Sequence, residues 1–176
     1  MSKKMRNDYI LTIKAETRPG LLHLASGIIE RKLIRIHSCS LAATDIHNIV
    51  LISIEITAGE SELASLALKL ENIIEVLSVE VKRYEETLCL RAAYFKMDRA
   101  FLDTPKVSIL NKYSAVIVNW YPDAFLAAKY GSDAAIRNLY NELDGPYLLG
   151  FSQTGLIADS KLIGEDESSV IHRLAA

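Results

Sequence analysis

The most constraining feature of the sequence is a strand-like segment, a turn and an amphipathic helix in direct succession. Residues 9–15 alternate between apolar and polar positions, as in a half-buried strand. Arg18-Pro19-Gly20 then breaks the strand, and both proline and glycine suit the start of a helix. The predicted helix has one apolar face, made of Leu21, Leu22, Ala25, Ile28, Ile29 and Leu33.

The same two periodicities continue to residue 84. Residues 34–44 and 49–57 read as two strands joined by a turn at 45–48, and residues 75–84 read as a further strand. Between them lies a second helical pattern, with Ser61 as its predicted N-cap and Leu63, Leu66, Ala67, Leu70 and Ile74 on one face. The order βαββαβ predicts an antiparallel sheet with both helices on one face, a ferredoxin-like arrangement. Its edge strands favour pairing with a second copy of the chain.

The second half is a looser repeat of this order. Strand-like runs cover 87–97, 114–121, 124–129 and 147–157, and a helix is predicted from residue 132 to about residue 143. The helical pattern over 98–113 is interrupted by Thr104-Pro105. The predicted fold class is therefore α+β, with two ferredoxin-like βαββαβ sandwiches in tandem. The predicted domains are residues 1–84 and 85–163, followed by a loosely ordered tail at 164–176.

Composition excludes several classes of function. The formal net charge of −2 argues against nucleic acid as a main partner, because phosphate binding needs a basic surface. No apolar run approaches the length of a membrane span, and the first ten residues do not read as a signal peptide. A cytoplasmic protein fits these features. Cys39 and Cys89 lie in strand-like runs, which favours buried free thiols over a disulfide or a metal site.

The sequence carries no recognised catalytic or phosphate-binding motif, and we predict neither catalytic residues nor a metal site. A helix that starts directly after a turn can bind a small anion, such as the carboxylate of an amino acid, at its N-terminus. Thr17 or Glu16 could instead accept hydrogen bonds from that helix start. Arg35 is a charge near the start of a strand, and it is either an outward solvated side chain or a contact for a ligand or interface.

Two long segments carry a resemblance to a known family. The first half resembles an ACT domain, a small-molecule sensing module, through PGLLHLASGIIERKLIRIHSCSLAATD, with its Gly-x-Leu helix start and closing Thr-Asp. The second half is similar to the C-terminal domain of the small, regulatory subunit of acetolactate synthase, through VIVNWYPDAFLAAKYGSDAAIRNLYNEL and GFSQTGLIADSK. The resemblance covers residues 9–161 in the same order and spacing.

The resemblance implies a non-catalytic regulatory subunit in branched-chain amino acid biosynthesis. Such subunits form homodimers through side-by-side ACT sheets, activate the large catalytic subunit and make it inhibitable by an amino acid, usually valine. They carry no cofactor, since thiamine diphosphate, FAD and magnesium belong to the catalytic partner. The effector lies at the ACT interface, which implies a site here made of Thr17, Arg18, Gly20, Leu21, Leu22, Arg35 and Ile36.

Two positions depart from the family pattern. Thr17 and Arg35 stand where the family has asparagine. Threonine keeps an oxygen but loses the amide donor, and arginine donates hydrogen bonds but accepts none. The alternative is therefore a free-standing tandem-ACT sensor that regulates another enzyme or a transcription factor. A small enzyme on a ferredoxin-like scaffold, with His23, His37 or Cys39 in a pocket, is the third hypothesis.

Overall fold

A computed structural model of the protein describes residues 6–158, and this part of the chain divides into two compact units. The first unit comprises residues 6–88 with 157–158, and the second comprises residues 89–156. The division thus lies between Leu88 and Cys89, whereas the predicted boundary follows Tyr84, which lies in a short 3-10 helix. The predicted tail at 164–176 lies outside the described residues. Within the described chain, no helix is both long enough and apolar enough to cross a membrane.

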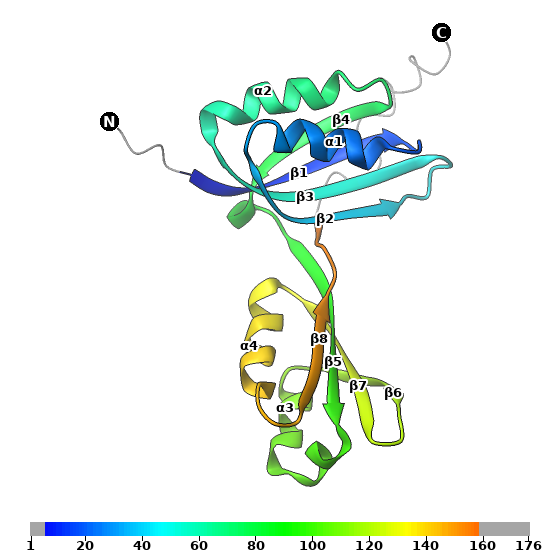
Figure 1. Ribbon diagram of the computed structural model, residues 1–176, viewed down its shortest axis with the longest axis vertical. Coiled ribbons are helices and arrows are strands. Elements are labelled where there is room, and N and C mark those ends of the chain that lie inside the picture. The colour runs from blue at the N-terminus through cyan, green and yellow to red at the C-terminus, as the bar shows by residue number, and fades with distance from the viewer. Residues whose placement is uncertain (1–5, 159–176) are drawn as a thin grey trace. The chain divides into compact units, whose positions relative to one another are not determined.

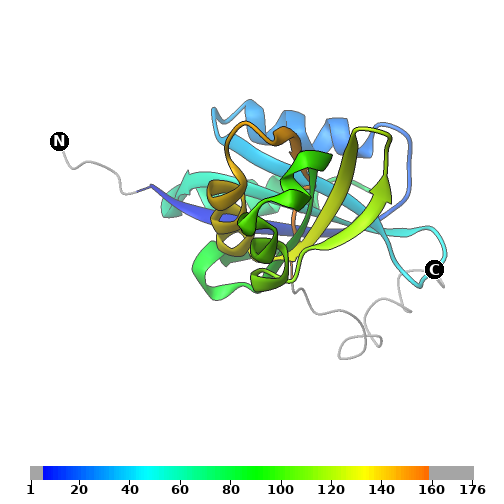
Figure 2. The same ribbon diagram turned by 90° about the horizontal axis from the view of Figure 1, so that it is seen from below.

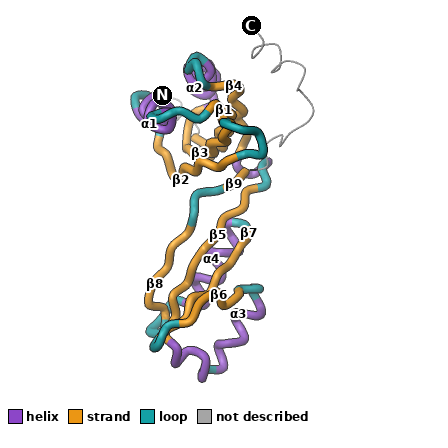
Figure 3. Tube along the Cα trace, turned by 90° about the vertical axis from the view of Figure 1, so that its right-hand side faces the viewer, coloured by secondary structure: helices purple, strands orange, loops and turns teal. Residues whose placement is uncertain are grey.

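The first unit is a four-stranded antiparallel sheet with two helices on one face (Figures 1 and 3). The strands lie in the order β2-β3-β1-β4, so β2 and β4 are the edges. The elements are β1 (Arg6–Glu16), α1 (Leu21–Glu30), β2 (Arg35–Ala43), β3 (Ile49–Gly59), α2 (Glu60–Glu71), β4 (Val76–Arg83) and the 3-10 helix η1 (Tyr84–Glu86); the two-residue strand β9 (Ile157–Ala158) is grouped with this unit.

The core of this unit forms where the apolar faces of strands and helices meet. Leu11 and Ile13 of β1, Ile52 and Ile54 of β3, and Leu66 of α2 are all fully buried there. These are the positions that the two sequence periodicities place on the inner faces.

Some predicted core positions are wrong. Leu33 and Ile74 are 85% and 92% exposed, because α1 ends at Glu30 and α2 ends at Glu71, before the apolar pattern does. The outer face of the sheet also differs from the prediction, since Ile10 and Ser53 are 1% and 2% exposed. The expectation that the strand over residues 9–15 is half-buried therefore fails at Ile10.

The predicted N-cap of α2 is also wrong by two residues. Gly59, not Ser61, is the N-cap, and α2 begins at Glu60. The Glu62 carboxylate accepts a hydrogen bond from the Gly59 N–H at 3.0 Å. This is half of a capping box, because glycine has no side chain with which to return the bond.

The second unit repeats this topology with a shorter first helix. Its main sheet has the order β6-β7-β5-β8, and α3 and α4 lie against each other on one face (Figure 2). The elements are β5 (Cys89–Asp98), the 3-10 helices η2 (Arg99–Asp103) and η3 (Pro105–Val107), α3 (Ser108–Lys112), β6 (Val116–Trp120), β7 (Ala124–Gly131), α4 (Asp133–Leu143) and β8 (Leu148–Gln153). The predicted fold class, two ferredoxin-like sandwiches in tandem, is confirmed.

Glu142 connects the short helix α3 to α4. Its carboxylate accepts hydrogen bonds from Lys112 Nζ and from the Tyr113 hydroxyl, each at 2.6 Å. These bonds, chiefly the one from Lys112, lower the pKa of the Glu142 carboxyl. They hold in place a helix of five residues, which is too short to be stable alone.

Candidate functional site at the β1–α1 turn

The turn from β1 into α1 is fixed by its backbone. Gly20 has φ +87° and ψ −6°, a left-handed conformation that glycine adopts without the strain of a Cβ. The Thr17 N–H donates to the Asn48 carbonyl at 2.7 Å, and the Glu16 N–H donates to the Glu75 carbonyl at 2.8 Å. The turn is thereby anchored to the β2–β3 hairpin on one side and to the residue before β4 on the other.

The N-terminus of α1 is open. Neither Thr17 nor Glu16 caps it, contrary to the expectation, because Gly20 is the N-cap and no side chain makes a capping hydrogen bond. The first turn of α1 contains no acidic residue. The partial positive charge of the helix start is therefore not neutralised within the helix, and this favours a nearby anion.

Arg18 is paired with an acid rather than left free for a ligand. Its guanidinium forms a hydrogen-bonded ion pair with the Glu75 carboxylate. Glu75 is 8% exposed as a residue, while the side chain of Arg18 is 63% exposed. The hydrogen bond from Arg18 is the main cause that lowers the pKa of the Glu75 carboxyl.

We expect Arg18→Gln to destabilise the protein near neutral pH and to have little effect in acid. A carboxyl whose pKa is lowered on folding stabilises the folded state above its unfolded pKa, about 4.3 for glutamate, and loses this contribution as the pH falls through the folded pKa. Urea midpoints of the wild type and the variant should therefore differ at pH 7 and converge as the pH falls below the lowered pKa of Glu75. Arg31→Gln, at an exposed residue directly after α1, is the control. A difference that does not change with pH would show that the pair does not act through the charge of Glu75.

The predicted site residues lie at two opposite ends of the first sheet. Thr17 and Gly20 follow β1 at the end where Glu16 pairs with Ile49, whereas Arg35 pairs with Thr57 at the other end. Ile49 and Thr57 are eight residues apart on β3, or roughly 26 Å at about 3.3 Å per residue. One copy of the chain therefore does not bring all the predicted residues together.

The side chains within each group differ in what they offer. Leu21 is buried in the core, and its N–H already donates to the Arg18 carbonyl at 3.2 Å. Leu22 is 38% exposed beside the turn. At the other end Arg35 is exposed and Ile36 is half-buried against the core.

A hydrogen-bonded chain of polar side chains lies beside Arg35, and no motif in the sequence indicates it. The Thr57 hydroxyl donates to Asp8 Oδ1 at 2.5 Å, and Nε2 of His37 lies 2.6 Å from the same hydroxyl oxygen. Because the Thr57 proton is directed to Asp8, Nε2 of His37 must be the donor in the second bond. Only the strand register brings these three residues together, since they come from β1, β2 and β3.

A pocket of about 420 Å³ in the first unit lies between α2 and β4, and none of the predicted site residues lines it. His23, His37 and Cys39 do not line it either. Among the described residues, no three histidine, cysteine or acidic side chains are grouped as metal ligands.

Two ferredoxin-like sandwiches in one chain define the class of fold to which this protein belongs. The acetolactate synthase small subunit from Thermotoga maritima has this fold, with a TM-score of 0.79 over 90% of this chain and 99% of that chain, at 12% sequence identity. The shared fold therefore spans both units.

Two further solved structures are similar at lower scores. The ACT domain from GTP pyrophosphokinase of Chlorobium tepidum has a TM-score of 0.39 at 23% identity and covers 44% of this chain and 100% of that domain. The regulatory subunit of aspartate kinase from Thermus thermophilus has a TM-score of 0.40 at 10% identity, with 78% of this chain and 93% of that chain covered. No family model matches the sequence, and no curated protein sequence matches it.

Proposed function

We propose that the protein is a non-catalytic regulatory subunit that binds acetolactate synthase, activates it and makes it respond to an amino-acid effector. The observation that carries this proposal is the fold shared with the small subunit from Thermotoga maritima across both units in the same order. The open start of α1 adds a place for the carboxylate of an effector.

The two groups of predicted site residues lie at opposite ends of the first sheet, and this supports a homodimer formed through β2. This strand is an edge of the first sheet and is nine residues long. If β2 pairs antiparallel with β2 of a second copy, the start of one strand lies beside the end of the other. Arg35 of one copy then approaches the end of the sheet at which the second copy's Gly20 lies, so that two composite effector sites form.

Regulation would follow from a shift between two states of the dimer. An effector that contacts both copies stabilises the arrangement in which its two half-sites are close. If the catalytic subunit binds the two arrangements with different affinity, the effector changes the activity of the complex.

A free-standing amino-acid sensor that regulates another enzyme or a transcription factor is the second candidate. It is favoured by Thr17 and Arg35, which stand where the resemblance implies asparagine. Co-purification with the acetolactate synthase large subunit separates the two candidates. Retention of the large subunit by the tagged chain supports the first, whereas no retention together with binding of an amino acid other than valine supports the second.

We expect Arg35→Ala to weaken effector binding by about ten- to hundredfold, the usual size of a lost charge-assisted hydrogen bond. Because Arg35 is exposed, the free energy of unfolding should change by less than about 0.5 kcal/mol. Calorimetry against an amino-acid panel measures the first quantity and urea unfolding the second. An affinity equal to that of the wild type would make Arg35 an ordinary surface charge.

A further inference from the structure

The pocket of the first unit plays no part in the regulatory proposal. It lies between α2 and β4, and its volume of about 420 Å³ is within the usual range of small-molecule sites. The described residues that line it all belong to the first unit, so the pocket needs no second copy of the chain.

The pocket is built by α2 and by two strands of the sheet. Its helix wall consists of residues spaced at i, i+3, i+4 and i+7, which share one face of α2: Glu60, Leu63, Ala64 and Ala67. Its sheet wall includes Tyr9 of β1 and two residues of β4, Val81 and Arg83. Tyr9 and Arg83 lie opposite each other in the strand pairing, and Val81 shares their face of the sheet because it is two residues from Arg83.

The hydroxyl of Tyr9 is buried, and it makes no hydrogen bond to any residue that the structure describes. Tyr9 is 4% exposed and packs in the hydrophobic core of the unit. A buried hydroxyl without a partner is unfavourable, and such groups are rare in folded proteins. Because Tyr9 lines the pocket, a molecule bound there can supply the missing hydrogen bond.

An exposed ion pair borders the pocket next to Tyr9. Nη2 of Arg83 lies 3.9 Å from the Glu60 carboxylate, and the two side chains are 48% and 82% exposed. The pair joins β4 to α2, and Arg83 lies directly opposite Tyr9 in the strand register. An exposed pair at this distance contributes little to stability, so an entering molecule can separate it at low cost and reach the hydroxyl.

The lining favours an uncharged molecule. Among the described residues that line the pocket, two are acidic and two are basic, so their formal charges cancel: Glu60, Glu86, Lys82 and Arg83. The interior is apolar, with Leu63 8% exposed and with Ala67 and Val81 half-buried. An ion that enters such surroundings loses hydration that no net charge of the lining replaces.

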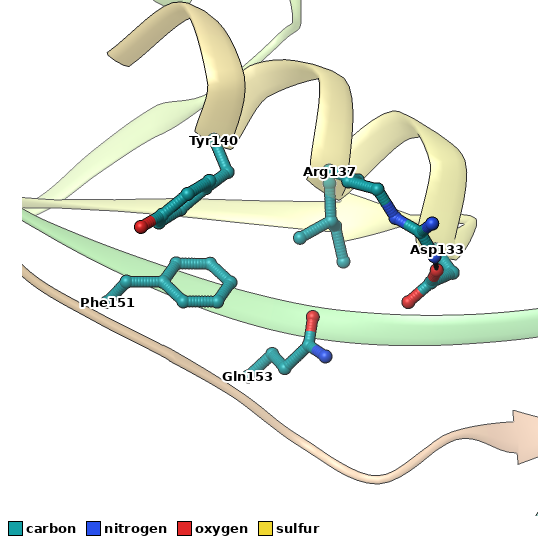
Figure 4. Close-up of a pocket in the computed structure, with 6 residues that line it drawn as sticks. Asp133, Arg137, Tyr140, Phe151 and Gln153 are labelled. Atoms are coloured by element: carbon teal, nitrogen blue, oxygen red, sulfur yellow. Dashed lines mark hydrogen bonds and ion pairs between the residues drawn. The ribbon is translucent and has the colours of Figure 1, made fainter. Parts of the chain in front are cut away.

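The equivalent pocket of the second unit differs at the position of Tyr9. It lies between α4 and β8, has a volume of about 610 Å³ and is shown in Figure 4. Its helix wall has the same spacing, at Asp133, Ile136, Arg137 and Tyr140. Ala93 pairs with Gln153 of its strand wall as Tyr9 pairs with Arg83, so an alanine takes the place of Tyr9. The buried hydroxyl is thus particular to the first unit and does not follow from the shared fold.

We propose that the pocket of the first unit binds a small uncharged molecule that has a compact apolar body and one hydrogen-bond acceptor, such as a ketone. The Tyr9 hydroxyl would donate to the acceptor, since a phenolic hydroxyl has one proton to give and has no other partner among the described residues. The apolar body would lie against Leu63, Ala67 and Val81.

Titration of the full-length protein with cyclohexanone, followed by amide chemical shifts, tests this proposal. We expect saturable changes at millimolar concentration, confined to β1, α2 and β4. Cyclohexanecarboxylate has a similar body but is ionised, and valine is a zwitterion, so each should bind at this pocket at least about tenfold more weakly. Because the test needs neither the large subunit nor an effector at the β1–α1 turn, its outcome is independent of the proposed function.

The variant Tyr9→Phe separates a ligand-binding hydroxyl from a structural one. It should weaken cyclohexanone binding by about two- to tenfold, the usual contribution of one hydrogen bond. In urea unfolding the same variant should be at least as stable as the wild type, because the hydroxyl that it removes has no partner among the described residues. Tyr130→Phe, at a tyrosine of the second unit that is 67% exposed, is the matched control and should change neither quantity.

A second variant tests the groove rather than the hydroxyl. Ala67→Leu keeps a good helix former and fills the groove from α2, so it should abolish binding while the fold is retained. The proposal is overturned if cyclohexanone does not bind at millimolar concentration, if Tyr9→Phe binds it equally well or is less stable than the wild type, or if the shifts lie outside the first unit. Equal binding of cyclohexanecarboxylate would also overturn it.

Discussion

Phe95→Ala is expected to unfold the second unit and to leave the first unit folded. Phe95 is fully buried at the centre of the second core, with its ring centroid 5.0 Å from that of Phe151. Removal of a buried phenylalanine costs about 3–5 kcal/mol. A unit the size of residues 89–156 has a total stability of roughly 3–10 kcal/mol, so the loss is a large part of it.

Hydrogen exchange resolves this expectation element by element. Amides of β5 and β7 should lose most of their protection in the variant, while amides of β1 and β3 should keep theirs, because the two cores share no residues. Leu149→Ala, at a side chain that is 50% exposed on β8, is the matched control and should change little. Loss of protection in both units together would show that they fold as one cooperative body.

A proline in the edge strand β2 is expected to break the proposed dimer. Successive residues of a strand direct their N–H groups to opposite sides, so of Leu41 and Ala42 one faces β3 and the other faces the free edge. Proline removes the N–H. Of the variants Leu41→Pro and Ala42→Pro, the one whose N–H faces the free edge should keep the fold and raise the dimer dissociation constant by at least about tenfold. The other variant should disturb the β2–β3 pairing.

Sedimentation velocity over a range of concentrations measures the association, and circular dichroism identifies which variant keeps its fold. The variant that stays folded and monomeric should also lose effector binding, since Arg35 and Gly20 then remain at opposite ends of the sheet. A wild-type chain that stays monomeric at micromolar concentration would contradict the dimer. So would two folded proline variants that associate as the wild type does.

The sequence was sufficient to predict the fold, because the strand and helix periodicities of its apolar residues are strong. Ile52, Ile54 and Ile56 alternate along β3, and Leu63, Leu66 and Leu70 recur along α2, and all six are buried. The short helix α3 was also foreseen, because Thr104-Pro105 interrupts the pattern before it.

Helix ends and the outer sheet face were not predictable in the same way. Leu33 and Ile74 continue an apolar pattern past the last helical residue, and periodicity alone does not report where hydrogen bonding stops. The burial of Ile10 and Ser53 is likewise not encoded in the alternation of residues along β1 and β3.

For the candidate sites, too, the sequence shows local motifs but not how distant residues are arranged in space. The motif around Gly20 was visible in the sequence, but the distance between Gly20 and Arg35 follows from strand register. The pocket of the second unit was missed, although its spacing is present as Asp133, Ile136, Arg137 and Tyr140 on one helical face. Nothing local to α4 indicates that Arg91 of β5 lies beside Asp133.

The steady-state rate of the acetolactate synthase large subunit tests most directly whether this chain regulates that catalytic partner, as we propose. The rate should be measured with increasing amounts of this protein, with and without an amino-acid effector. We predict that the rate rises to a plateau at stoichiometric addition, and that an effector lowers this plateau for the wild type but less for Arg35→Ala. A rate that stays at the level of the large subunit alone, at any ratio of the two proteins, would contradict the account.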